Sequence, residues 1–239
     1  MKRARIVNIG FNRWHSAIAH IPRRNAALGI AGLAVVGAAL AGPATGVPAT
    51  RAVAASAAAT SAAAAAPAPF EKALSPDFQF QPNYYYCAPA AVRLALTADG
   101  HASPNMDELA SQLGTTTFGT NSAEDTTRVL NGVLGAGIYQ TRAIPGISAT
   151  AAETDLLRAD VVRSISNGHA VVANIAGYTT DVNGGFHSYP GHYLTVIGYG
   201  QGGATMKIAD PADTQGTGYY WISTGNLANW IGSHGYSTA

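Results

Sequence analysis

Cysteine is nearly absent from the 239-residue chain, which contains only Cys87. A single cysteine cannot form an intramolecular disulfide, so the sequence excludes a domain held together by such bonds. Cys87 stands in the stretch FQPNYYYCAPAAVRLAL, residues 80–96, where three tyrosines precede it and an alanine-rich apolar run follows. The thiol is therefore either a small packed apolar side chain or a reactive group.

Charged residues are also few, at 11% of the chain, and they are unevenly distributed. All thirteen acidic residues follow Arg51, and only seven of the fourteen basic residues do, so this part has a formal net charge of −6. Nucleic-acid-binding proteins present a basic surface, and we therefore expect no nucleic-acid partner. The sequence shows no phosphate-binding loop, dinucleotide-binding motif or zinc-ligand cluster, so we expect no metal or other cofactor.

Long hydrophobic runs are missing as well. Residues 26–41, AALGIAGLAVVGAALA, are apolar but too short and too rich in alanine and glycine for a confident membrane span. Because a basic segment precedes this run and small residues follow it, we predict a signal peptide over residues 1–54, cleaved after Ala52-Val53-Ala54. An uncleaved signal anchor is the alternative. The signal predicts a secreted protein, free or associated with the cell wall, that meets the membrane only during export.

Residues 55–69 consist almost entirely of alanine, serine, threonine and proline, which predicts an Ala/Pro-rich linker. Residues 70–239 are then long enough for one domain with one hydrophobic core. Helical patterns fill the first half of this domain, over residues 87–100, 103–114, 122–135 and 148–168. We expect Ser103 and Ser122 to cap the second and third of these helices, because serine accepts hydrogen bonds from the first helical N–H groups.

Strand patterns fill the second half, over residues 169–178, 192–200, 204–211 and 218–223. The glycine-rich turn between the second and third of these strands indicates a hairpin, and residues 224–232 suggest a closing helix capped by Ser223 or Thr224. Helices first and antiparallel strands second favour an α+β fold over a parallel α/β fold.

Cys87 stands where a helix should begin, with Pro89 two residues later. A helix N-terminus and a nearby imidazolium both favour the reactive thiolate. Among the five histidines after residue 70, His192 is the best partner, because it opens a long apolar strand directly after a loop. We expect His101 and His169 to be solvated or structural, His187 to lie in a glycine-rich loop, and His234 to lie near a flexible end.

Two further residues complete a candidate site. Asp210 ends the strand after that of His192, so a hairpin would return its carboxylate beside the imidazole and orient it. Gln81, six residues before Cys87, could point an amide N–H at the carbonyl that the thiolate attacks. The alternative is that Asp210 only starts a turn and that Gln81 is an ordinary loop residue.

The ordered set of Gln81, Cys87, His192 and Asp210 resembles the papain-like cysteine peptidases, in particular the double-glycine or bacteriocin-leader peptidases and their secreted, free-standing C39-like relatives. The matching segments are QPNYYYCAPAAVRLAL, HAVVANIAGY, GHYLTVIGYG and IADPAD. The resemblance implies a papain-like fold with Cys87 as nucleophile, His192 as general base and acid, Asp210 as its orienting group and Gln81 as oxyanion donor.

Two positions differ from the family pattern. Ala88 stands where the family usually has glycine, and Tyr86 stands where transporter-linked members usually have an acidic residue. We expect a secreted cysteine peptidase that acts on a peptide or protein substrate. The alternatives are an amidase or endopeptidase that cleaves cell-wall peptides, and a catalytically silent peptide-binding domain of the same fold. The sequence indicates no oligomeric state.

Overall fold

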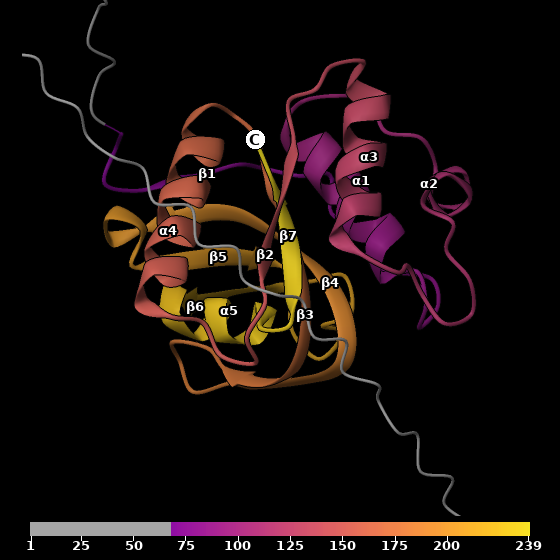
Figure 1. Ribbon diagram of the computed structural model, residues 1–239. Helices are drawn as coiled ribbons and strands as arrows, with labels where there is room; N and C mark the ends of the chain where they lie inside the picture. The colour runs from indigo at the N-terminus through magenta and orange to yellow at the C-terminus, as the bar shows by residue number, and fades with distance from the viewer. Residues whose placement is uncertain (1–67) are drawn as a thin grey trace, which may run out of the picture. The chain divides into compact units, whose positions relative to one another are not determined.

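The computed structural model describes residues 68–239, and the predicted signal peptide and all but two residues of the predicted linker lie outside this range (Figure 1). The described elements, in chain order, are β1 (Lys72–Ala73), α1 (Cys87–Ala98), α2 (Met106–Leu113), α3 (Ala123–Leu134), β2 (Gln140–Ile144), α4 (Ala151–Ser166), β3 (Val171–Thr180), β4 (Phe186–Gly200), the 3-10 turn η1 (Gln201–Gly203), β5 (Thr205–Ala209), β6 (Tyr219–Ser223), α5 (Thr224–Ile231) and β7 (His234–Thr238).

The strands form one antiparallel sheet in the order β2-β7-β3-β4-β5-β6, with β1 paired to β4. Figure 1 shows α1, α2 and α3 on one side of this sheet and α4 and α5 on the other. The expected α+β class is therefore confirmed, and so is the expected hairpin, which η1 closes between β4 and β5.

The helices form where the sequence predicts them, with one error in capping. Ser103 was expected to cap α2, but the helix begins later, and Asn105 is its N-cap in a reciprocal capping box with Glu108. The box satisfies two N–H groups that a serine at position 103 could not reach. Ser122 does occupy the N-cap of α3, yet its hydroxyl bonds to the Asp125 side chain instead of the backbone. Ser223 caps α5 as expected.

The strand predictions miss three elements and misplace one boundary. β1, β2 and β7 were not predicted, and His234 lies in β7 between β2 and β3, so the prediction that it lies near a flexible end was wrong. β4 starts at Phe186, so His187 belongs to a strand and not to a loop, and His192 lies within β4 instead of opening it. Cross-strand pairing with β3 extends β4 through a segment whose own glycine and proline content argues for a loop.

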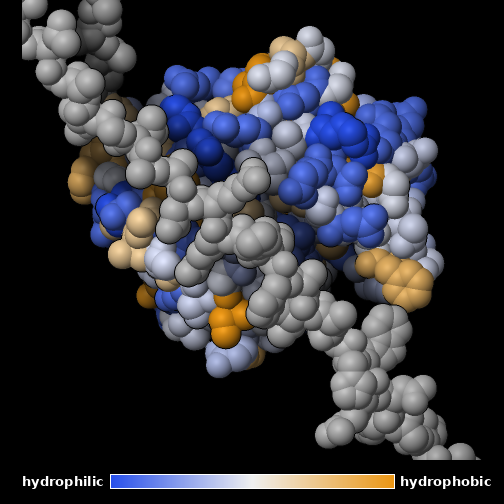
Figure 2. All heavy atoms as spheres, viewed as in Figure 1, coloured by the Kyte–Doolittle hydropathy of each residue, from blue (hydrophilic) through white to orange (hydrophobic). Residues whose placement is uncertain are grey.

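Both faces of the sheet are buried, because side chains alternate between two hydrophobic cores. Along β3, Val171 and Ala173 pack in the core under α4 and α5, whereas Val172 packs in the core under α1, α2 and α3. Consequently all nine residues from His192 to Gly200 are buried. None of the helices among residues 68–239 is long and apolar enough to span a membrane. The visible surface is mostly hydrophilic, with apolar residues in small separate patches (Figure 2).

Candidate active site

Cys87 is the first residue of α1, and its side chain is nearly buried, with an exposed fraction of 7%. Pro89 lies in the first turn, where a missing N–H costs no helical hydrogen bond, so the helix starts at the cysteine. Ala88 is fully buried in the core beneath α1 and does not line the pocket at the thiol. The methyl group that replaces the family's usual glycine therefore packs inward and leaves the access to sulfur open.

A pocket of about 320 Å³ opens beside the thiol. It is lined by Cys87, by the 117–119 segment, by Pro190 and Gly191, and by Tyr84 and Tyr85. Tyr84 is 78% exposed, so its ring lies at the surface beside the pocket and does not pack in the core. Tyr86 instead donates its hydroxyl to Asp107 at 2.8 Å. The aromatic rings of Tyr84 and Tyr85 thus form one wall of a cleft that leads to Cys87.

His192 is the first buried residue of β4, with an exposed fraction of 3%. It pairs with Ile175 of β3, so the ladder fixes its backbone. The imidazole Nε2 lies 2.8 Å from Oδ1 of Asp210, and Cys87 is close enough to the ring to raise its pKa. Because Nε2 faces the carboxylate, Nδ1 is the nitrogen left for the thiol. The structure therefore brings Cys87, His192 and Asp210 together as the sequence predicts.

Asp210 follows β5 directly and is completely buried. Its Oδ1 accepts hydrogen bonds from the His192 ring and from the backbone N–H of Ala212, the latter at 2.9 Å. Its Oδ2 accepts hydrogen bonds from the hydroxyl of Tyr189 at 3.0 Å and from that of Tyr220 at 2.9 Å. A buried carboxylate is costly unless its lone pairs are satisfied. These four donors stabilise the charged form, and the carboxylate is held in a single orientation toward the imidazole.

Tyr189 and Tyr220 were missed by the sequence analysis. Tyr189 also stacks on the His192 ring, with the centroids 4.2 Å apart and the planes at 26°. Tyr220 reaches Asp210 from β6, where it pairs with Ile208 two residues before the aspartate. The sequence carried only a weak signal for Tyr189, its position three residues before His192. Tyr220 becomes a neighbour only through the pairing of β5 with β6.

The electrostatics of the three residues favour an ion pair. Burial alone would raise the pKa of the Cys87 thiol, but the hydrogen bond and positive charge of His192, helped by backbone groups of Tyr193 and Ala88, lower it below its usual range. Burial alone would lower the pKa of His192, yet Asp210 and Cys87 raise it to about 9. Burial alone would raise the pKa of Asp210, but the hydrogen bond and positive charge of His192 outweigh it and lower this pKa. Both shifts favour the thiolate–imidazolium pair over the neutral pair.

Gln81 lies beside the same turn, because its backbone N–H donates to the carbonyl of Pro211 at 3.0 Å. Its side-chain Nε2 donates to the carbonyl of Asn83 at 2.8 Å, and its Oε1 is buried without a hydrogen-bond partner among the described residues. An amide nitrogen carries two N–H groups, so one remains. The structure thus holds Gln81 next to the Asp210 turn, and its role as oxyanion donor stays a prediction.

The other histidines lie outside this cluster. His101 is exposed, as expected. His169 pairs with the buried Asp99 at 2.9 Å, and His187 contacts Asp181 at 3.3 Å and stacks on Tyr220. His234 directs Nδ1 at the carbonyl of Gly232 at 2.9 Å. Among the histidines that the structure describes, only His192 thus lies beside both a carboxylate and the thiol.

Residues 73–237 match the model of the family described as "Peptidase_C39 like family". The chain belongs to this family. The resemblance to C39-like cysteine peptidases is thereby confirmed. A search of the curated proteins finds no match to this chain.

Solved structures with a similar fold are also found. A putative C39-like peptidase from Bacillus anthracis is 16% identical, with a TM-score of 0.47, covering 70% of this chain and 97% of that one. Xylellain, a cysteine protease from Xylella fastidiosa, is 12% identical, with a TM-score of 0.47, and the match covers 72% of this chain and 86% of that one. A double glycine motif protease from a transporter, in complex with the leader peptide, is 12% identical, with a TM-score of 0.42, covering 70% and 92%.

Proposed function

We propose that the protein is a secreted cysteine peptidase that hydrolyses peptide bonds in peptide or protein substrates. The observation that carries this proposal is the arrangement of Cys87, His192 and Asp210 beside an open pocket. A thiol at a helix N-terminus has its pKa lowered by a neighbouring imidazole, whose Nε2 lies 2.8 Å from a buried carboxylate. These are the three components that nucleophilic acyl transfer requires.

The chemistry follows from the charges of these groups. The Cys87 thiolate attacks the carbonyl carbon of the scissile bond and forms a tetrahedral intermediate. The N–H of Cys87 at the start of α1 and the remaining N–H of Gln81 stabilise the negative oxygen. The imidazolium of His192 then donates its proton to the leaving amine, and an acyl-enzyme remains. Neutral His192 takes a proton from water, and the resulting hydroxide attacks the thioester to release the acid and restore the thiolate.

The structural details favour this hypothesis over a silent peptide-binding domain. Such a domain has no need for a thiol at a helix N-terminus beside the one histidine that Asp210 orients, with a pocket open to the sulfur. Ala88, the position that kept the silent alternative open, packs in the core and does not obstruct the thiol. Secretion remains part of the proposal because the predicted signal peptide supports it.

The pH dependence of Cys87 alkylation tests the proposal directly. A neutral iodoacetamide reagent should label the wild-type thiol rapidly well below the usual pKa of cysteine, because His192 stabilises the thiolate. In His192→Ala the labelling midpoint should move to higher pH, since burial then acts without the compensating charge. A midpoint in the ordinary cysteine range that His192→Ala leaves unchanged would reject the ion pair and, with it, the proposed mechanism.

A further inference from the structure

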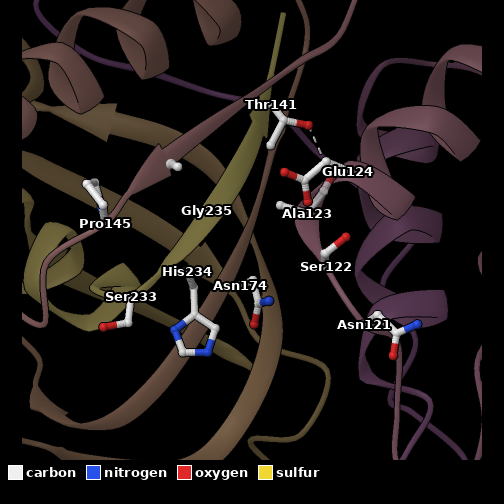
Figure 3. Close-up of a pocket in the computed structure, with 11 residues that line it drawn as sticks. Asn121, Ser122, Ala123, Glu124, Thr141, Pro145, Asn174, Ser233, His234 and Gly235 are labelled. Atoms are coloured by element: carbon white, nitrogen blue, oxygen red, sulfur yellow. Dashed lines mark hydrogen bonds between the residues drawn. The ribbon is translucent and has the colours of Figure 1, made fainter. Parts of the chain in front are cut away.

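A second pocket lies on the other side of the 117–122 segment from the thiol. It has a volume of about 280 Å³ and lies between the start of α3 and strands β2, β3 and β7 (Figure 3). Its polar lining residues include Glu124, Asn174 and His234. Figure 3 shows Glu124 and His234 on opposite sides of the pocket, with Asn174 between them.

Tyr193 connects this pocket to the candidate active site. Tyr193 directly follows His192 in β4, and its hydroxyl donates to the carbonyl of Thr120 at 3.4 Å and accepts a hydrogen bond from the Asn174 amide at 3.0 Å. Asn174 pairs with Tyr193 in the β3–β4 ladder, next to the pair of Ile175 with His192. One lining residue of the pocket, Asn174, is therefore one ladder position away from the pair that contains His192.

Asn174 is a buried polar residue whose amide oxygen faces the pocket. The residue is only 7% exposed. Because the Tyr193 hydroxyl donates its single hydrogen to Thr120, it can only accept from Asn174, which fixes the amide nitrogen on that side. The amide oxygen is then turned to the side of His234, as Figure 3 shows, and no hydrogen bond reaches it from residues 68–239. This oxygen is open to the pocket, so a ligand that fills the pocket and displaces water from it has to offer it a hydrogen-bond donor.

The pocket also contains a carboxylate and an imidazole, beside the amide of Asn121 and the hydroxyls of Ser122, Thr141 and Ser233. Glu124 forms no ion pair or side-chain hydrogen bond with any of residues 68–239, whereas its neighbour Asp125 pairs with Arg128. His234 directs Nδ1 at a backbone carbonyl, which can only accept, so Nδ1 carries a proton and a neutral ring would accept at Nε2. The two carboxylates in the first turn of α3 already compensate the positive end of that helix.

A carboxylate, an amide oxygen and an imidazole nitrogen together suit a ligand with several N–H donors and a positive charge. We propose that this pocket is a subsite that binds a basic side chain, lysine or arginine, of the peptide that Cys87 cleaves. The inference rests on the proposed peptidase function and assigns it a substrate preference. An acidic side chain would meet Glu124 with like charge, and an apolar one would leave the Asn174 oxygen without a partner.

Quenched fluorescent peptides test the subsite when each position around a cleavable bond is replaced in turn by lysine, norleucine and glutamate. At one position the wild type should cleave the lysine peptide with a kcat/KM about tenfold higher than the norleucine peptide, the effect of one charge-assisted hydrogen bond. Glu124→Gln should bring this ratio close to one, and Glu124→Lys should favour the glutamate peptide. The control Glu71→Gln changes an exposed glutamate outside the pocket and should keep the wild-type ratio.

Binding of the same peptides to Cys87→Ala protein, measured by fluorescence anisotropy, separates failure of the subsite from failure of the function. Cleavage without a preference for lysine, or with a preference that Glu124→Gln keeps, would overturn the subsite and leave the peptidase intact. Absent cleavage, together with lysine-selective binding that depends on Glu124, would support the subsite and reject the enzyme. Absence of both cleavage and selective binding would overturn both.

Discussion

The two ends of helix α1 carry the same pair of side chains in different settings. At its start, Cys87 meets the pair of His192 with Asp210, whose atoms lie 2.8 Å apart. At its end, the C-cap residue Asp99 pairs with His169 at 2.9 Å. Both carboxylates are fully buried, and both accept a tyrosine hydroxyl and a backbone N–H. An imidazole–carboxylate pair is thus not by itself a sign of catalysis.

The difference lies on the second nitrogen of each ring. In His192 it faces a thiol, and the ring is 3% exposed, whereas the side chain of His169 is 21% exposed. Asp99 also binds the backbone N–H of Ala170 at 2.8 Å, so the second pair ties the end of α1 to the segment before β3. One pair therefore orients a reactive group, and the other braces two elements. The following predictions test this distinction.

The largest effect is expected from Cys87→Ala. Because the thiolate forms the covalent intermediate, its loss should lower kcat by about four orders of magnitude or more. The alanine side chain fits the same nearly buried position, so the circular dichroism spectrum and the melting temperature should stay close to wild type. Peptide hydrolysis followed by mass spectrometry measures the change, and turnover equal to wild type would exclude Cys87 as nucleophile.

Asp210→Asn should have the next largest effect, a loss of about 100-fold in kcat/KM, because the imidazolium loses its neutralising charge. The pKa of His192 is about 9 because Asp210 and Cys87 stabilise its charged form. Wild-type activity should therefore fall as the pH rises through about 9, where His192 loses its proton. Without the carboxylate this basic limb should move to lower pH. A limb that stays in place would show that Asp210 does not control the titration of His192.

Tyr189→Phe should have a smaller effect, about fivefold in kcat/KM, because it removes one of four hydrogen bonds to Asp210 and keeps the ring on His192. Tyr220→Phe is the matched variant, since it removes the other hydroxyl from the same oxygen without touching that stack. Tyr189→Leu removes both contributions and should cost more than either. Equal losses in all three variants would assign no role to the stacked ring.

The smallest effect on catalysis is expected at the other end of α1. His169→Ala should leave kcat/KM unchanged, but it deprives the buried Asp99 of one partner and should lower the free energy of unfolding by about 1–3 kcal/mol. Urea denaturation measures the stability, and the peptide assay measures the activity. A large loss of kcat/KM in correctly folded protein would contradict the division between an orienting pair and a bracing pair.

Sequence reasoning predicted what is encoded locally. The start of α1 at Cys87 follows from Pro89, and the pairing of His192 with Asp210 follows from a hairpin whose turn is visible in the glycines. It failed where a residue depends on partners distant in sequence. β2 and β7 are strands because they pair with each other across 90 or more residues, and Tyr220 reaches Asp210 only through the register of β5 and β6. Ser103 failed because Asn105 with Glu108 makes the stronger cap.

The position of β7 has a consequence for the timing of synthesis. Residues 234–238 fill the place between β2 and β3, so a nascent chain that has been translated only through β6 and α5 has no strand there. In such an incomplete chain the sheet ends at β3, and β2 has no partner strand. Because translation runs from the N-terminus, the last strand is also the one that joins the two parts of the sheet. We expect the cooperative core, and the rigid support that it gives to His192, to form only after the ribosome has released this strand.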